Sequence, residues 1–264
     1  MRIISWNVNG IRAVDRKGAL SEFLKKYAPD IFLIQEIKAQ EEQLVKLKFR
    51  EKYDQYEQFY HPAEKPGYAG TAIWIKKDFF AEFSPKFQTG MPNFKDTEGR
   101  ISRISFTKDG KDFEILGVYF PNGGKSPEAW NGKLIFYEKF LDFVNQLREQ
   151  GKEVIFAGDV NCAHHEIDLA RPESNRNSIG FLPEERDWLT KWEENGWIDI
   201  FREKFPEKVV YSWWHVITRA RARNVGWRID YFFIDQKSRE KIKNIEYLND
   251  QMGSDHCPVI LEVF

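Results

Sequence analysis

Four short polar clusters contain the residues of this sequence whose types and spacing suit metal-assisted chemistry. They are Trp6-Asn7-Val8-Asn9, Gln35-Glu36, Asp159-Val160-Asn161 and Ser254-Asp255-His256. Carboxylate and amide oxygens are ligands that Mg²⁺ prefers, and a histidine can stabilise charge on a phosphoryl oxygen. A single Asp-x-Asn is equally typical of a calcium loop or a turn. The four clusters together predict a magnesium-dependent phosphodiester hydrolase.

Apolar runs precede three of these clusters and predict the strands that position them. The runs are Ile3-Ile4, Ile31–Ile34 and Val154–Ala157. Strands that are apolar on both faces are expected in the middle of a layered fold. A carboxylate at the end of such a strand is held more firmly than one on a loop, as metal-assisted chemistry requires.

Individual side chains within the clusters suggest separate tasks. Glu36 is the expected direct metal ligand, although an exposed strand-end glutamate is the commoner outcome. Asp159 and Asn161 leave the same face of an extended segment, where one could orient water and the other a phosphate oxygen, or both could form an Asx turn. His256 could stabilise negative charge, and Asp230 is a candidate partner that would fix its tautomer. The other four histidines, including the adjacent pair at 164–165, are expected to be surface or packing residues.

The composition favours one intracellular domain. No linker divides the 264 residues, and 42% hydrophobic and 16% aromatic content supplies a large core. Cys162 and Cys257 have no disulfide or zinc spacing, which indicates packing roles in a reducing compartment. A basic-then-apolar leader and a run of about 20 apolar residues are both lacking. We therefore expect a soluble, cytoplasmic protein that does not bind membranes.

The charge pattern provides one local candidate for phosphate binding. Lys plus Arg number 40 and Asp plus Glu 41, so overall charge does not indicate a nucleic-acid partner. The segment 215–228 contains no acidic residue. In an extended stretch Arg219, Arg221 and Arg223 would share one side and could follow a phosphate backbone, with Arg228 further along. A solvated loop is an equally good interpretation.

Periodicity predicts alternating helices and strands in two similar halves. The expected helices are 17–27, 41–49, 133–150 and 183–195. The further expected strands are 55–60, 71–76, 101–107, 113–119, 198–201, 229–234, 245–248 and 259–263. Because each half opens with a polar cluster after a buried strand, we expect two sheets packed face to face with both clusters at one rim.

The motifs, taken in order, resemble the exonuclease III family of abasic-site endonucleases, within the larger endonuclease/exonuclease/phosphatase group. The resemblance runs from end to end and includes Ser5-Trp6-Asn7-Val8-Asn9-Gly10, Leu33-Ile34-Gln35-Glu36-Ile37-Lys38, Val118-Tyr119-Phe120-Pro121-Asn122-Gly123, Gly158-Asp159-Val160-Asn161, Ile167-Asp168-Leu169, Asn224-Val225-Gly226-Trp227-Arg228-Ile229-Asp230-Tyr231 and Gly253-Ser254-Asp255-His256-Cys257-Pro258. It implies an α/β fold, a four-layer α/β sandwich of two mixed sheets with helices on both outer faces.

The resemblance also implies a set of roles. Glu36 would bind Mg²⁺, for which Mn²⁺ may substitute, with help from Asn7, Asn9 and Asp255. Asp159 would activate water and Asn161 would position it. Tyr119 and Asn122 would contact the scissile phosphate, and Asp230 would hold His256 on a non-bridging oxygen. Water would attack the phosphate 5′ of a base-free sugar and leave a 3′-hydroxyl and a 5′-deoxyribose phosphate.

The expected partner is therefore duplex DNA with abasic sites, bound by a monomer. Trp213, Trp227 and Ile229 match the family's pocket for the extruded sugar, whereas Trp214 is expected in the core. Lys125 and Ile217 occupy positions where relatives differ in the residues that wedge into DNA. Accessory 3′→5′ exonuclease and 3′-repair phosphodiesterase activities are expected too. The alternatives are a phosphodiesterase or phosphatase acting on RNA or a small phosphoester, an endonuclease acting beside deaminated bases, and a non-catalytic DNA-binding module.

Overall fold

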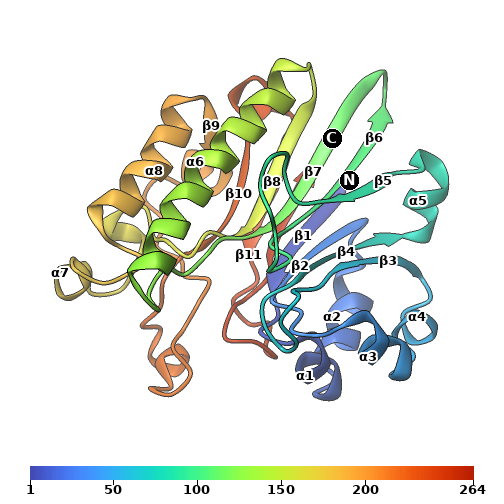
Figure 1. Cartoon of the computed structure of the whole chain (residues 1–264), viewed down its shortest axis with the longest axis horizontal. Coiled ribbons are helices and arrows are strands. Elements are labelled where there is room, and N and C mark those ends of the chain that lie inside the picture. Colours follow the sequence, from blue (N-terminus) through green and yellow to red (C-terminus); the bar gives the residue numbers. More distant parts are fainter.

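Two six-stranded mixed sheets pack face to face and are covered by helices on their outer faces. The computed structural model describes all 264 residues. Figure 1 shows the long helix α6 (Pro127–Glu149) and α8 (Pro183–Glu194) over one sheet. Beside the other sheet lie α1 (Ile11–Arg16), α2 (Ala19–Tyr27), α3 (Glu41–Lys46) and α4 (Phe49–Lys52). The predicted four-layer α/β sandwich is confirmed.

The first sheet carries the strands that begin and end the chain. Its members are β1 (Arg2–Asn7), β2 (Ile31–Gln35), β3 (Tyr56–His61), β4 (Thr71–Lys76), β11 (Ile242–Tyr247) and β12 (Val259–Val263). The spatial order is β11-β12-β1-β2-β4-β3. Only β1 and β2 are parallel neighbours, with Asn7 opposite Gln35. The clusters that follow β1 and β2 therefore emerge side by side.

The second sheet has the same plan. Its members are β5 (Lys86–Thr89), β6 (Ile101–Lys108), β7 (Lys111–Tyr119), β8 (Glu153–Asp159), β9 (Trp197–Asp199) and β10 (Asp230–Asp235), in the order β5-β6-β7-β8-β10-β9. Here β7 and β8 are the parallel pair, with Tyr119 opposite Asp159. The antiparallel register of β10 sets Asp230 opposite Asp159 as well. Three predicted site residues thus lie in one row across the sheet.

The helices connect the strands around the outside. They are α1 (Ile11–Arg16), α2 (Ala19–Tyr27), α3 (Glu41–Lys46), α4 (Phe49–Lys52), α5 (Lys77–Phe83), α6 (Pro127–Glu149), α7 (Pro172–Asn175), α8 (Pro183–Glu194) and α9 (Ile200–Lys204). Short 3₁₀ helices cover Glu166–Asp168, Ala220–Arg223 and Gln236–Lys241.

Three apolar layers hold these four structural layers together. The central layer joins the two sheets through side chains such as Leu33, Ile115 and Phe232. The outer layers join each sheet to its helices, for example through Phe23 of α2 and Phe140 of α6. Burial on both faces explains why the central strands are apolar throughout. The strand ends are the points where polar side chains can emerge from this core.

Two predicted helices have other bounds because the backbone turns left-handed at a residue within them. The predicted helix 17–27 begins only at Ala19, since Gly18, with φ 76°, separates α2 from α1. The predicted helix 41–49 is likewise interrupted at Lys48, with φ 54°. These conformations break the helical hydrogen-bond pattern, although apolar spacing continues across them.

Two other boundaries are corrected by helix capping. The helix predicted from Lys133 begins at Pro127, because the Ser126 hydroxyl accepts a hydrogen bond from the Ala129 N–H. The predicted strand 198–201 ends at Asp199, whose carboxylate caps α9. Both are ordinary N-terminal caps, with serine or aspartate accepting from the first free backbone amides.

Candidate active site

The ends of β1, β2 and β8 bring an amide between two carboxylates. Nδ2 of Asn7 donates to Oε1 of Glu36 and to Oδ2 of Asp159, at 2.9 Å each. Its Oδ1 accepts from the backbone N–H of Asn9 at 3.0 Å. Asn7 therefore presents nitrogen to the acids, and both ends of its amide are occupied. The four clusters of the sequence meet at one rim of the sandwich, as their spacing predicted.

A histidine between two aspartates lies at the centre of this rim. Nδ1 of His256 is 2.8 Å from Oδ2 of Asp230, and its Nε2 is 3.8 Å from Oδ2 of Asp159. Burial alone would lower the pKa of His256, but the Asp230 carboxylate outweighs it and raises the pKa to about 10. Burial raises the pKa of Asp159 to about 7, reinforced by Asp230 and Glu36 and opposed by His256. At neutral pH the site thus combines an imidazolium with a carboxylate close to its own pKa.

Asn161 is fixed in front of Asp159. Its backbone N–H donates to Oδ1 of Asp159 at 2.8 Å, and its Nδ2 donates to the Phe120 carbonyl at 2.8 Å. Its Oδ1 accepts from Nδ2 of Asn122 at 3.2 Å. Tyr119 is buried beside these groups, and burial raises its pKa well above the usual range, so its phenol stays protonated.

Asp255 links the metal-type residues to an aromatic wall. Its Oδ1 accepts from Nδ2 of Asn9 at 2.9 Å, and its Oδ2 accepts from the indole N–H of Trp213 at 3.1 Å. Burial opposes ionisation of Asp255, but His256 and these two donors lower its pKa. The carboxylate is therefore ionised and oriented.

The donor set fits a hard divalent cation. Ligand atoms of Glu36, Asp159 and His256 lie within 4.8 Å of one another, and the two carboxylates are the ligands among them, because His256 is protonated. The Lys38 ammonium is 2.7 Å from Oε2 of Glu36 and also bonds Oδ1 of Asn9, so a positive charge is already favoured there. Carboxylate and amide oxygens suit Mg²⁺ or Mn²⁺ and offer no thiolate to softer metals. The sequence analysis missed this lysine as a site residue, and nothing in its spacing marked it.

A cavity of about 370 Å³ joins the acids to apolar walls. Trp213, Trp227 and Ile229 line it together with Asp159 and His256. The predicted pocket residues therefore border the same space as the predicted catalytic residues. Further lining side chains that the sequence analysis missed are Asn175, Ser178 and Ile179. Trp214 is buried in the central core, as expected.

A buried ion pair supports the two loops that carry the asparagines. Nζ of Lys133 donates to the carbonyls of Asn122 and Asn161, at 3.2 and 2.8 Å, and pairs with Glu185. Oε2 of Glu185 accepts from the Gly180 and Leu182 amides. Both charged side chains are fully buried. Sequence reasoning missed this pair because its members belong to α6 and α8, 52 residues apart.

The expected extended stretch of arginines is wrong. Residues 220–223 form a 3₁₀ helix, so the alternating spacing no longer places three guanidinium groups on one side. Arg221 is half-buried and donates to the Ser254, Asn249 and Gln251 carbonyls. Arg228 is fully buried and pairs with two aspartates. These two arginines organise the protein interior and do not form a phosphate-binding row.

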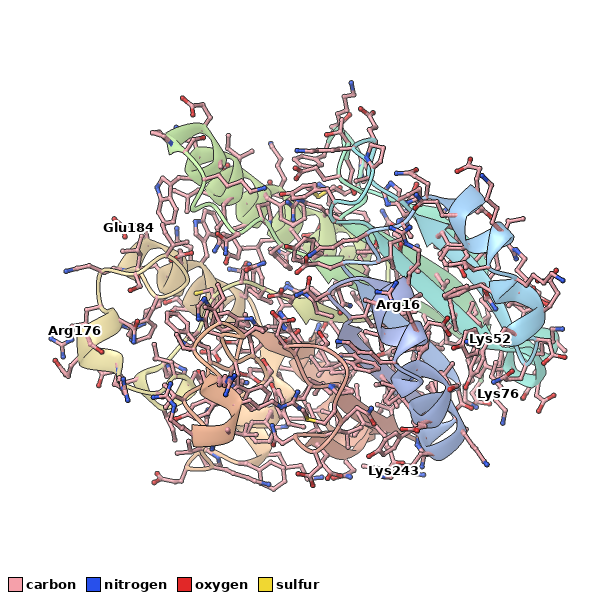
Figure 2. The ribbon with its side chains drawn as sticks, turned by 90° about the horizontal axis from the view of Figure 1, so that it is seen from below. Arg16, Lys52, Lys76, Arg176, Glu184 and Lys243 are labelled. Atoms are coloured by element: carbon pink, nitrogen blue, oxygen red, sulfur yellow. The ribbon has the colours of Figure 1, made fainter.

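The other predicted DNA contacts lie on the surface. Arg219, Arg223 and Lys125 are exposed, and the Ile217 side chain is 87% exposed. Nζ of Lys125 is 2.9 Å from the Tyr68 hydroxyl. Figure 2 views the molecule from below, with Arg16 of α1 to the right of the centre and Arg176, beside α7, at the left edge. The exposed positions leave these side chains available to a large ligand.

Three site residues have a left-handed backbone. The φ values are 45° for Asn9, 51° for Glu36 and 54° for Asn161. Each residue directly follows a strand or its first turn, where the chain changes direction. Asparagine tolerates this conformation, but glutamate adopts it at some cost. Backbone hydrogen bonds flanking Glu36, from Val8 to Gln35 and from Gly10 to Glu36, hold the turn.

The fold and site define a class of α/β-sandwich hydrolases in which acids, amides and one histidine converge at strand ends. The sequence profile of the Endonuclease/Exonuclease/phosphatase family matches residues 4–256, and the chain belongs to this family. It is 39% identical to the exodeoxyribonuclease of Bacillus subtilis over 99% of this chain and 98% of that protein. It is 34% identical to the DNA repair nuclease APEX1 of Danio rerio, over 99% and 81% of the two chains.

Solved structures agree with this assignment. The AP endonuclease of Leishmania major superposes with a TM-score of 0.90 at 26% identity, covering 98% of this chain and 86% of its own. The predicted resemblance to the exonuclease III family is thus confirmed. None of the helices combines the length and apolar character needed to cross a membrane.

Proposed function

We propose that this protein hydrolyses the phosphodiester bond 5′ of abasic sites in duplex DNA with the help of Mg²⁺. One observation carries the proposal: the cavity that contains Asp159 and His256 is also lined by Trp213, Trp227 and Ile229. Apolar and aromatic walls suit a base-free deoxyribose, which costs little to extrude because its base no longer stacks. The phosphate attached to that sugar would lie against the acids and the imidazolium.

The residues supply a base, a charge stabiliser and orientation. Asp159 accepts a proton from the attacking water, and Asn161 orients that water towards phosphorus. The P–O3′ bond breaks as the water oxygen bonds to phosphorus, and the departing 3′ oxygen takes a proton from solvent to become a hydroxyl. His256, held cationic by Asp230, stabilises charge on a non-bridging oxygen. A bound Mg²⁺ or Mn²⁺, held by Glu36 and Asp255 with Asn9, would neutralise the phosphate.

Neighbouring side chains have supporting roles in this proposal. The Tyr119 phenol and the Asn122 amide would donate to the scissile phosphate. Asn7, whose Nδ2 bridges Glu36 and Asp159, would hold the two carboxylates at a fixed separation. We propose that the protein acts as a monomer, and the match to a bacterial protein over nearly its whole length supports a cytoplasmic location.

A second activity on DNA ends is supported by the relatives. The Bacillus subtilis relative is an exodeoxyribonuclease, and this chain matches it over 98% of its length. A 3′-terminal nucleotide or fragment presents the same phosphodiester chemistry to the same acids. We therefore propose 3′→5′ exonuclease and 3′-repair activity alongside abasic-site cleavage.

Substrate comparison tests the proposal. We expect Mg²⁺-dependent turnover to be fastest on a duplex with one tetrahydrofuran site, and slower on a duplex with a deaminated base, on single-stranded RNA and on an inositol phosphate. Faster turnover of the RNA or the inositol phosphate would overturn the proposed substrate. Faster cutting beside the deaminated base would change the lesion but retain the chemistry.

Two variants distinguish an enzyme from a DNA-binding module. Asp159→Asn and His256→Ala should each lose at least about 10³-fold in turnover, because each removes a group that acts in the transition state. Binding of the abasic duplex, measured by fluorescence anisotropy, should survive in both. Unchanged turnover in both variants would defeat the assignment.

A further inference from the structure

A second cluster of metal-type ligands lies outside the proposed active site. His164 and His165 follow the segment after β8, and Glu193 lies near the end of α8, next to β9 (Figure 1). Ligand atoms of these three residues lie within 4.8 Å of one another. His164 is buried, His165 is half-buried, and the Glu193 side chain is 37% exposed. None of the three lines the cavity that contains Asp159.

The hydrogen bonds of His164 fix which ring nitrogen is free. Its Nε2 is 2.9 Å from Oγ1 of Thr190. The Thr190 hydroxyl donates its only proton to the Arg186 carbonyl, so Oγ1 accepts from Nε2–H. Nδ1 of His164 therefore carries a lone pair. A hydrogen bond to one imidazole nitrogen is the usual way that proteins orient the other towards a metal.

That lone pair faces a carboxylate without a donor between them. Nδ1 of His164 is 3.7 Å from Oε1 of Glu193. Burial raises the pKa of Glu193 to about 7 and lowers the pKa of His164 to about 3, so the isolated side chains resist charge of either sign. Two hydrogen-bond acceptors that face each other in a half-buried place favour a cation or a proton between them.

The neighbouring arginines do not supply that cation. Arg202 and Arg228 pair with Asp168, and Arg228 also pairs with Asp199. Arg186 uses its Nε to donate to the His164 carbonyl at 2.7 Å. The carboxylate of Glu193 is thus left facing imidazole nitrogen, while the arginines are engaged elsewhere.

We propose that His164, His165 and Glu193 bind a divalent transition-metal ion, with Zn²⁺ as the best fit. Two imidazoles and one carboxylate are a common zinc ligand set, and bonds of about 2.0–2.2 Å to one ion can span the 3.7 Å between Nδ1 and Oε1. His165 and Glu193 also line an open cavity of about 350 Å³, which leaves room for water as a fourth ligand. The imidazoles distinguish this site from the oxygen-rich set around Glu36.

The proposed ion would connect the segment that follows β8 to helix α8. His164 lies three residues beyond Asn161 in the chain, and Glu193 lies on α8, the helix that carries Glu185. Bound metal would therefore fix the segment after Asn161 against α8. We therefore expect the bound metal mainly to raise the thermal stability of the protein.

Spectroscopic titration of the full chain tests the site. Co²⁺ is added to metal-free protein in excess Mg²⁺, and visible d–d absorption is recorded; Zn²⁺ competition and calorimetry then give stoichiometry and Kd. We expect one saturable site, with absorption that Zn²⁺ removes. His165→Ala and Glu193→Gln should each weaken Zn²⁺ binding at least tenfold, and Zn²⁺ should raise the Tm of the unmodified protein but not of these variants.

Two controls make the result specific. Glu36→Ala removes a ligand of the proposed Mg²⁺ site, and His215→Ala removes an exposed histidine elsewhere; both should retain the cobalt spectrum. His164→Ala is not used alone, because loss of a buried ring could prevent folding. Absence of a saturable site, or equal Zn²⁺ affinity in His165→Ala and Glu193→Gln, would overturn the proposal.

Discussion

Replacement of Asp230 by asparagine should change the charge of His256 at neutral pH. The carboxylate of Asp230, 2.8 Å from Nδ1, raises the pKa of His256 from 6.5 to about 10 against the effect of burial. A pKa of about 10 keeps more than ~99% of the imidazole protonated at pH 7.5. In Asp230→Asn the pKa should fall towards 6.5, because Asp159 and Asp255 oppose the effect of burial less strongly than Asp230 does, and at a pKa of 6.5 only ~10% of the imidazole would be protonated at that pH.

The sign of the pH effect follows from this shift. If the imidazolium stabilises the phosphate, activity of the unmodified protein should persist up to pH 9.5, whereas activity of Asp230→Asn should fall as pH rises from 6 to 8. At pH 7.5 the variant should lose at least ~10-fold in turnover from His256 protonation alone. Single-turnover cleavage of a tetrahydrofuran duplex between pH 5.5 and 9.5 measures both profiles, and ¹⁵N NMR of the imidazole measures the pKa directly. The reasoning is refuted if the NMR pKa of His256 falls while the alkaline limb of the rate profile does not move.

Three further predictions concern the support of the site, the binding of DNA and the register of the sheet. Lys133→Met should lower the free energy of unfolding by ~3–5 kcal/mol, because it leaves the Glu185 carboxylate buried and unpaired, and it should also lower kcat. Glu114 is similarly buried, and Glu114→Gln should lower the Tm without lowering kcat. Equal losses of kcat in the two variants would contradict a positioning role for Lys133. Arg223→Ala should make duplex affinity depend less steeply on salt concentration. Arg221→Ala should lower the Tm and leave this salt dependence unchanged, because Arg221 bonds carbonyls of the protein itself. Duplex binding measured at several salt concentrations checks both. Gly158→Ala should cost at least ~3 kcal/mol in urea unfolding, because the added Cβ would lie 1.8 Å from a carbonyl oxygen of the neighbouring strand; a normal midpoint would argue against the parallel register there.

The layers of the fold were accessible from sequence because buried central strands are apolar on both faces. The run Ile31–Ile34 lies in the buried strand β2, as its apolar pattern predicted, and Gln35 ends that strand. Helix ends were less accessible, since apolar spacing does not show where the backbone turns left-handed, as it does at Gly18 and Lys48. The start of α6 was readable but overlooked: Ser126 followed by Pro127 is an ordinary N-terminal signal.

Some of the site residues could be predicted from sequence and others could not. Side chains at strand ends, such as Asp159 and Glu36, could be predicted to lie close together, because sheet register brings strand ends to a common rim. Groups that act through long-range pairs could not, since no local pattern marks Lys133 as the partner of Glu185, 52 residues away. The prediction for the arginine segment was wrong because residues 220–223 form a 3₁₀ helix. Alternating residues share one side only in an extended conformation.

The positive φ angles of Asn9, Glu36 and Asn161 restrict how this rim can vary during directed evolution. β-Branched residues would strain the backbone at all three positions, so a random library would contain many members that are destabilised whatever their reactivity. A library limited to asparagine, aspartate, glycine and glutamate would keep the backbone accessible and vary only the reach and charge of each side chain. The useful sequence space around the reacting phosphate is thus small, and nearly all of it can be made and assayed.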